Sequence, residues 1–180
     1  ILGLAGAWLF YTGNLLWVEN RRRRSKPDGT LFTQRKDVKV MASLTVGICL
    51  GSVCGISLML ASSKWLALES QATYAHFQWV YYFMFFAAIV WSFIRGAARS
   101  LVELLYLASM LTAAMPLTSL LSILIPSTGL WMHTELDTLM VDSVALMLAV
   151  SFIMLAKATS QRVYHSQVTD SVWSYRPAIR

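Results

Sequence analysis

The placement of positive charge along this chain constrains its fold more than any other feature. Five apolar runs follow one another. Of the 15 Lys and Arg residues, 14 lie in the segments that follow the first, third and fifth runs, and the exception, Lys64, follows the second run. Basic residues next to membrane-spanning segments resist translocation, so the links that carry them stay in the cytoplasm. The pattern predicts an integral membrane protein whose N-terminus lies outside and whose C-terminus lies inside. The 14 residues are Arg21, Arg22, Arg23, Arg24, Lys26, Arg35, Lys36, Lys39, Arg95, Arg99, Lys157, Arg162, Arg176 and Arg180.

The lengths of the apolar runs fit helices that cross a bilayer. A helix rises 1.5 Å per residue, so about 20 residues cross a hydrocarbon core of about 30 Å. No stretch alternates as a strand of a membrane barrel would. We therefore predict an all-α bundle of five transmembrane helices within residues 1–162, a basic cytoplasmic loop at 20–39 and a polar cytoplasmic tail at 163–180. The predicted spans are residues 1–18, 40–60, 74–94, 101–125 and 139–157.

Composition narrows the class of partner. The chain is 57% hydrophobic with a mean hydropathy of +0.56, well above a typical soluble domain. Its net charge of +6 borders the apolar runs, which favours anionic lipid headgroups over nucleic acid. The expected surroundings are therefore a lipid bilayer and other membrane subunits. The sequence also starts at Ile1 inside an apolar run without a signal-peptide pattern, and we expect it to be the C-terminal part of a longer protein.

Small residues within the spans predict how helices meet. Gly47, Gly51 and Gly55 recur every four residues and so share one face, which lets two helix backbones approach closely. We interpret that face as a packing surface, with a cofactor-binding face as the alternative. Cys49 and Cys54 are interpreted as small packing residues. Further along, Pro116 predicts a kink, and Arg99 and Glu103, four residues apart, predict an intrahelical pair.

Two histidines on the predicted outer side are candidate metal ligands. His76 begins the third span, and His133 lies between the fourth and fifth spans, close to Glu135, Asp137 and Asp142. Neutral imidazole is the usual protein ligand of haem iron, so both histidines are candidate haem ligands and His76 is the candidate metal ligand. The alternative is an interfacial belt, where histidine and aromatic residues are also common. The aromatic neighbours of His76 are Tyr74, Phe77, Trp79, Tyr81 and Tyr82.

Several segments resemble the C-terminal transmembrane region of the PepSY-associated transmembrane proteins. The resemblance covers nearly the whole chain. The segments that carry it are TGNLLWVE at 12–19 with the arginines that follow, QRKDV at 34–38, WSFIRGAAR at 91–99, PLTS at 116–119 and PSTGLW at 126–131.

This resemblance implies a function in iron uptake. Members of the family include bacterial inner-membrane reductases that act on ferric siderophores in the periplasm, with haem b in the helical bundle. The family's earlier helices and periplasmic PepSY modules are not part of this sequence. A second interpretation is a non-catalytic accessory or scaffold subunit of a larger membrane complex, held through the glycine face. A third is a small transporter that uses Asp142 and the kink at Pro116.

The predicted orientation is testable with reporters. We expect a fluorescent protein fused after Arg180 to fold and fluoresce, because that end stays in the cytoplasm. Alkaline phosphatase, which is active only outside, should be active when inserted after Glu69, in the link between the second and third spans. Phosphatase activity of a fusion after Arg180 would overturn the orientation.

Overall fold

The computed structural model describes residues 12–13, 16–17, 36–66, 74–124 and 136–165, and nearly all of them are helical. The four long helices are α2 (Lys36–Leu66), α3 (Tyr74–Arg95), α4 (Ala97–Leu124) and α5 (Leu136–His165). Within the described residues there is no strand, which confirms the all-helical prediction. Of the predicted first span, residues 1–18, only 12–13 and 16–17 are described, so that span stays a prediction.

Each long helix contains a segment long and apolar enough to cross a membrane. These segments are Val38–Ser63, Tyr74–Arg95, Ala97–Ser122 and Leu139–Tyr164. The chain is therefore a multi-pass membrane protein by the length and composition of its helices. The helix α4 continues through Pro116 to Leu124, so the proline does not end it.

The helix α5 is longer than the sequence predicted, since it runs past residue 157 to His165. No Gly or Pro lies between residues 136 and 165 to end it earlier. Near its end, Val163 is buried together with Ala98 and Val102 of α4. The polar C-terminal end of α5 therefore packs against the start of α4.

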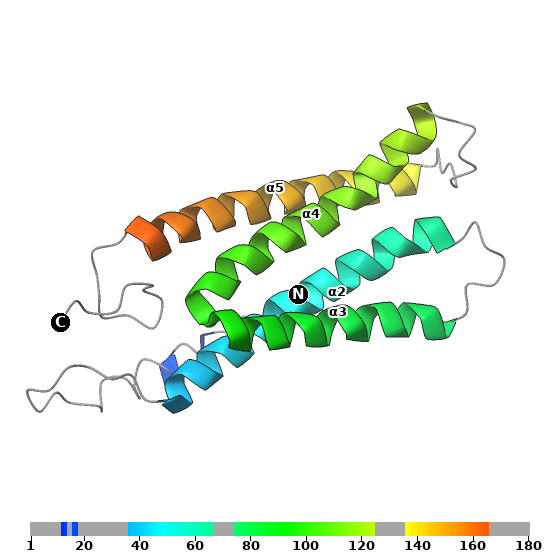
Figure 1. The fold of residues 1–180 in the computed structure, drawn as a ribbon. Helices are drawn as coiled ribbons and strands as arrows, with labels where there is room; N and C mark the ends of the chain where they lie inside the picture. The colour runs from blue at the N-terminus through cyan, green and yellow to red at the C-terminus, as the bar shows by residue number, and fades with distance from the viewer. Residues whose placement is uncertain (1–11, 14–15, 18–35, 67–73, 125–135, 166–180) are drawn as a thin grey trace, which may run out of the picture.

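The helices form two layered pairs (Figure 1). The helices α2 and α3 lie side by side in one layer, and α4 and α5 form the other. The helix α4 contacts all three of the others, whereas α5 contacts only α4 among the described helices. The helix α4 therefore joins the two layers.

The glycine face of α2 packs against α3. A Cβ atom added at Gly47 would lie 2.9 Å from the Cα atom of Ile89, and one added at Gly55 would lie 2.9 Å from the ring of Tyr81. Gly51, between them, is slightly less confined, with 3.2 Å from an added Cβ to the backbone oxygen of Phe85 in α3. The predicted packing role of these glycines is confirmed, and their partner is a helix of the same chain.

Hydroxyl groups join the helices at several levels. Near the α3–α4 link, Ser92 Oγ of α3 donates to the backbone oxygen of Ser43 in α2 at 2.6 Å and lies 3.1 Å from Ser100 Oγ of α4. Cys54 is buried and its Sγ lies 3.8 Å from the oxygen of Leu104, whereas Cys49 is exposed. The packing role predicted for the cysteines therefore holds for Cys54.

Hydrogen bonds of hydroxyl groups also join α4 to α2 and to α5, closer to the C-terminal end of α4. Ser57 of α2 and Thr112 of α4 share a hydrogen bond of 3.0 Å. Ser109 of α4 donates to the backbone oxygen of Ala149 in α5 at 3.0 Å. Among the described residues, every buried polar side chain belongs to Ser or Thr. Such bonds between membrane helices each contribute about 0.6 kcal/mol on average.

A single glycine links α3 to α4. Gly96 has a φ of +78°, in the left-handed region that residues with a Cβ rarely adopt. Its N–H donates to the oxygen of Ser92 at 3.0 Å, and its oxygen accepts from the N–H of Ser100 at 3.1 Å. The turn is so short that the end of α3 and the first turns of α4 lie next to each other.

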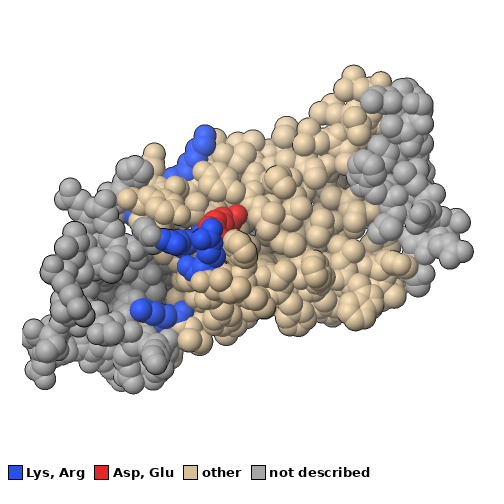
Figure 2. Space-filling model, in the orientation of Figure 1, with Lys and Arg blue, Asp and Glu red and all other residues tan. Residues whose placement is uncertain are grey.

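The Lys and Arg side chains that the structure describes, together with Glu103, gather at one end of the bundle, which we call the charged end. Figure 2 shows blue and red atoms near one end of the visible face and none along the rest of its described surface. The start of α2, the link between α3 and α4, and the late part of α5 share this end in Figure 1. The basic residues on these segments whose side chains are described are Lys39, Arg95, Arg99, Lys157 and Arg162.

The glycine packing predicts a specific loss of stability. We expect Gly47→Ala to lower the free energy of unfolding by about 1–3 kcal/mol, because the new methyl group meets backbone that cannot move aside. Gly13→Ala is the control, since an added Cβ at Gly13 meets nothing within 4 Å. Unfolding in mixed detergent micelles measures both variants. Equal stability of the two would contradict the packing described here.

Candidate functional site

One face of α3 carries a line of exposed side chains that we call the α3 stripe. Its members recur at intervals of three or four residues, so they lie along one side of the helix. Trp79 and Phe83 are 75% and 76% exposed, which means that no described helix covers them. The stripe consists of His76, Trp79, Phe83, Phe86, Val90 and Ile94.

Side chains of α3 alone also line a shallow apolar hollow of about 730 Å³ on this side of the molecule. The hollow extends from Trp79 to Ile94 and includes Tyr82 and Trp91. Aromatic rings make up much of its wall. The hollow and the stripe together present a broad aromatic surface at the outside of the bundle.

His76 lies at the end of the α3 stripe that is far from the charged end of the bundle. It is the third residue of α3, it is exposed, and it precedes Trp79 by one helical turn. An exposed imidazole can bind a metal through either ring nitrogen. His76 and Trp79 therefore lie on the same side of α3, and both are exposed.

The interior between α2 and α3 does not have room for a porphyrin. Helix backbones that approach as closely as Gly47 and Ile89 leave no space for a planar group between them. The α3 stripe is the open surface that carries an imidazole. The described residues on this face that would hold a haem are His76, with Trp79 and Phe83 on the same side of α3.

The other residues predicted for this site are not brought to it by the described structure. His133 and Glu135 lie outside the described residues, and no side-chain contact of Asp137 is described. Asp142 lies in α5, which does not contact α3, and it has an interaction partner of its own. Among the described residues, no group of three or more His, Cys, Asp or Glu could hold a metal ion. The role of His133 as a ligand stays a prediction.

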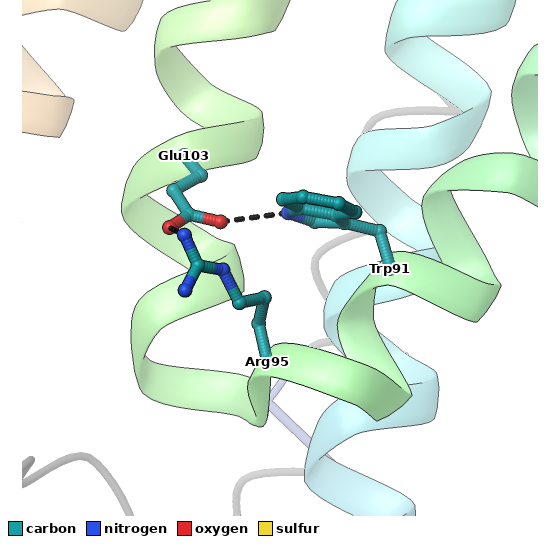
Figure 3. Close-up of polar contacts among 3 residues, drawn as sticks. All are labelled: Trp91, Arg95 and Glu103. Atoms are coloured by element: carbon teal, nitrogen blue, oxygen red, sulfur yellow. Dashed lines mark hydrogen bonds and ion pairs between the residues drawn. The ribbon is translucent and has the colours of Figure 1, made fainter.

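A polar cluster lies at the opposite end of α3 (Figure 3). Arg95 Nη2 lies 2.9 Å from Glu103 Oε1, and the indole N–H of Trp91 donates to Glu103 Oε2 at 2.7 Å. The guanidinium carbon of Arg95 also lies 5.4 Å from the centroid of the Trp91 ring, within reach of a cation–π interaction. The carboxylate of α4 is thus held by two side chains of α3.

The sequence prediction of a pair between Arg99 and Glu103 did not include these contacts with α3. Trp91 and Arg95 are four residues apart and so share a face of α3. Gly96 then reverses the chain, which brings that face opposite Glu103. The glycine between the two spans was the signal that could have identified this cluster.

Comparison of the chain with protein-family models, with curated proteins and with solved structures finds no match.

The cluster predicts a coupling that a double-mutant cycle can measure. We expect Glu103→Gln to destabilise the bundle, because Arg95 then lies at the membrane without its carboxylate. Arg95→Gln combined with Glu103→Gln should cost less than the two single changes added together, by about 1 kcal/mol. Thermal unfolding of the four proteins in one detergent gives the coupling energy. Strict additivity would mean that the ion pair contributes nothing.

Proposed function

We propose that this chain is the membrane-embedded part of a haem-linked reductase of the bacterial inner membrane, which reduces ferric siderophores on the periplasmic side. The resemblance of its segments to PepSY-associated transmembrane proteins supports the proposal from the sequence. The single structural observation that supports it is the position of His76 at the end of the α3 stripe, exposed and one turn from Trp79.

The distribution of charge supports the orientation that this function requires. The basic side chains that the structure describes gather at one end of the bundle, whereas Lys64 belongs to the other end of α2. Basic residues favour the cytoplasmic side. The helix α3 begins with Tyr74 at the other end and finishes with Arg95 at the basic end. In this orientation His76 faces the periplasm, where a ferric chelate arrives.

In this proposal, the chain itself supplies a ligand and an apolar wall. The imidazole of His76 is the proposed axial ligand, and the rings of Trp79 and Phe83 pack beside the group and exclude water. A bound haem b supplies one-electron chemistry at that position. A second ligand comes from His133, from an earlier part of a longer chain or from another subunit.

A second candidate is a non-catalytic accessory subunit of a larger membrane complex. The specific observation in its favour is the interior, in which no Asp, Glu, Lys, Arg or His side chain is buried among the described residues. Ionisable side chains inside membrane helices usually mark proton, ion or substrate pathways. In addition, only 11% of the α3 span and 17% of the α5 span is buried, against 39% for α2 and α4. Both outer helices therefore have faces free for lipid or for partner helices.

A visible spectrum separates the two candidates. We expect the full-length protein, purified in mild detergent, to give the sharp α and β bands of a b-type haem in a reduced-minus-oxidised spectrum. His76→Ala should abolish or shift these bands, because it removes the proposed axial ligand. His165→Ala, at the end of α5, is the matched control and should leave them unchanged.

Three outcomes are decisive. Loss of the bands in His76→Ala alone supports the reductase. Unchanged haem content in that variant removes His76 as the ligand. A featureless spectrum of intact full-length protein favours the accessory subunit.

A further inference from the structure

A groove between α3 and α4 has one polar end. Its volume is about 350 Å³, within the range of roughly 300–1,000 Å³ that small-molecule sites occupy. Most of its lining is apolar, and the exposed side chains of Ala87 and Trp91 lie at its rim. The helices α3 and α4 have the least extensive contact of any pair that touches, which leaves this space open beyond the Gly96 turn. The lining residues are Met84, Ala87, Ala88, Trp91, Glu103, Leu104 and Leu107.

The polar end of the groove is the cluster of Trp91, Arg95 and Glu103. Trp91 and Glu103 line the groove directly, and Arg95 is bound to Glu103 at 2.9 Å. The side chains of Arg95 and Glu103 are 42% and 30% exposed, so both can reach a further partner. A carboxylate accepts about four hydrogen bonds and a guanidinium donates five, which exceeds the contacts that the two make here.

The groove together with its polar end is about as long as one leaflet of a bilayer is thick. Met84 precedes Arg95 by 11 residues of α3, which is about 16 Å of helix. Half of a hydrocarbon core is about 15 Å. The groove and the polar cluster at its end, taken together, therefore extend from the interface to about the middle of the membrane, as an acyl chain does. Figure 2 places the charged side chains of the visible face at the same end of the molecule.

The charges of the cluster favour one type of headgroup. Arg95 offers a positive charge to a phosphate, and Glu103 offers a negative charge to an amine. An anionic headgroup without an amine would satisfy Arg95 and be repelled by Glu103. A choline headgroup carries no N–H to donate to the carboxylate. Arg99, one turn before Glu103 on α4, adds positive charge to this region and already has an interaction partner of its own.

We propose that the α3–α4 groove is a binding site for an amine-bearing phospholipid of the inner leaflet. One acyl chain lies along Met84, Ala88 and Leu107. The phosphate binds Arg95, and the ammonium group binds Glu103. This site involves none of the residues proposed to hold haem, and it does not depend on the proposed function.

Native mass spectrometry tests the proposal. The delipidated full-length protein is mixed with equal amounts of phosphatidylethanolamine, phosphatidylcholine and phosphatidylglycerol in detergent. We expect the ethanolamine lipid to be retained about tenfold more than the choline lipid. The free energy of one charge-assisted hydrogen bond corresponds to a difference in affinity of about that size. Glu103→Gln should reduce that preference to near unity, because the neutral amide no longer attracts the ammonium group.

Two variants make the result specific. Asp142→Asn removes a carboxylate from α5, which does not contact α3, and should leave the preference intact. Ala87→Phe fills the groove while it keeps Trp91, Arg95 and Glu103, and should lower retention of every lipid.

Three outcomes would overturn the proposal. The first is equal retention of the three lipids by the unaltered protein, and the second is an unchanged preference in Glu103→Gln. The third is copurification of a quinone that Ala87→Phe removes, which would assign the groove to a quinone instead.

Discussion

Close approach of two helix backbones, α2 against α3, is the constraint on which the rest of the structure depends. Lipid gives no hydrophobic drive to helix association, so membrane helices associate through tight packing and through hydrogen bonds. Gly47, Gly51 and Gly55 provide the packing, and they fix which side of α3 faces α2. The opposite side of α3, with His76 and the aromatic rings, is left outside.

The helix α4 holds the two layers of helices together. It contacts α2, α3 and α5, and its hydroxyl groups at Ser100, Ser109 and Thr112 each bond to a neighbouring helix. The helix α5 contacts α4 alone among the described helices, so a change in α4 affects both layers at once. The short turn at Gly96 also sets the start of α4 against the end of α3. The ion pair of Arg95 with Glu103, and the groove beside it, both follow from that turn.

Features that depend on local sequence could be predicted, whereas those that depend on relative helix rotation could not. Hydropathy located the four described spans, and a four-residue spacing identified the glycine face as a packing surface. Hydropathy marks where a helix leaves the bilayer but not where it ends, so the extension of α5 to His165 was missed. The sequence placed His76 on α3, but only the contacts of α2 reveal that it lies on the exposed side. The contacts of Glu103 with Arg95 and Trp91 were not predicted for the same reason, since the face of α3 that meets α4 is fixed by Gly96.

The most direct test of this arrangement is a disulfide cross-link between α2 and α3. In a background of Cys49→Ser and Cys54→Ala, the pair Gly51→Cys and Ala88→Cys should oxidise rapidly in native membranes. A Cβ atom added at Gly51 would lie 3.1 Å from the Cβ atom of Ala88, slightly closer than the spacing of about 3.5–4.5 Å found in disulfides. Loss of maleimide labelling after mild oxidation measures the reaction. The pair Gly51→Cys and Phe83→Cys should stay reduced, because Phe83 faces away. Faster oxidation of the second pair would mean that α3 is rotated and that its aromatic stripe faces the interior.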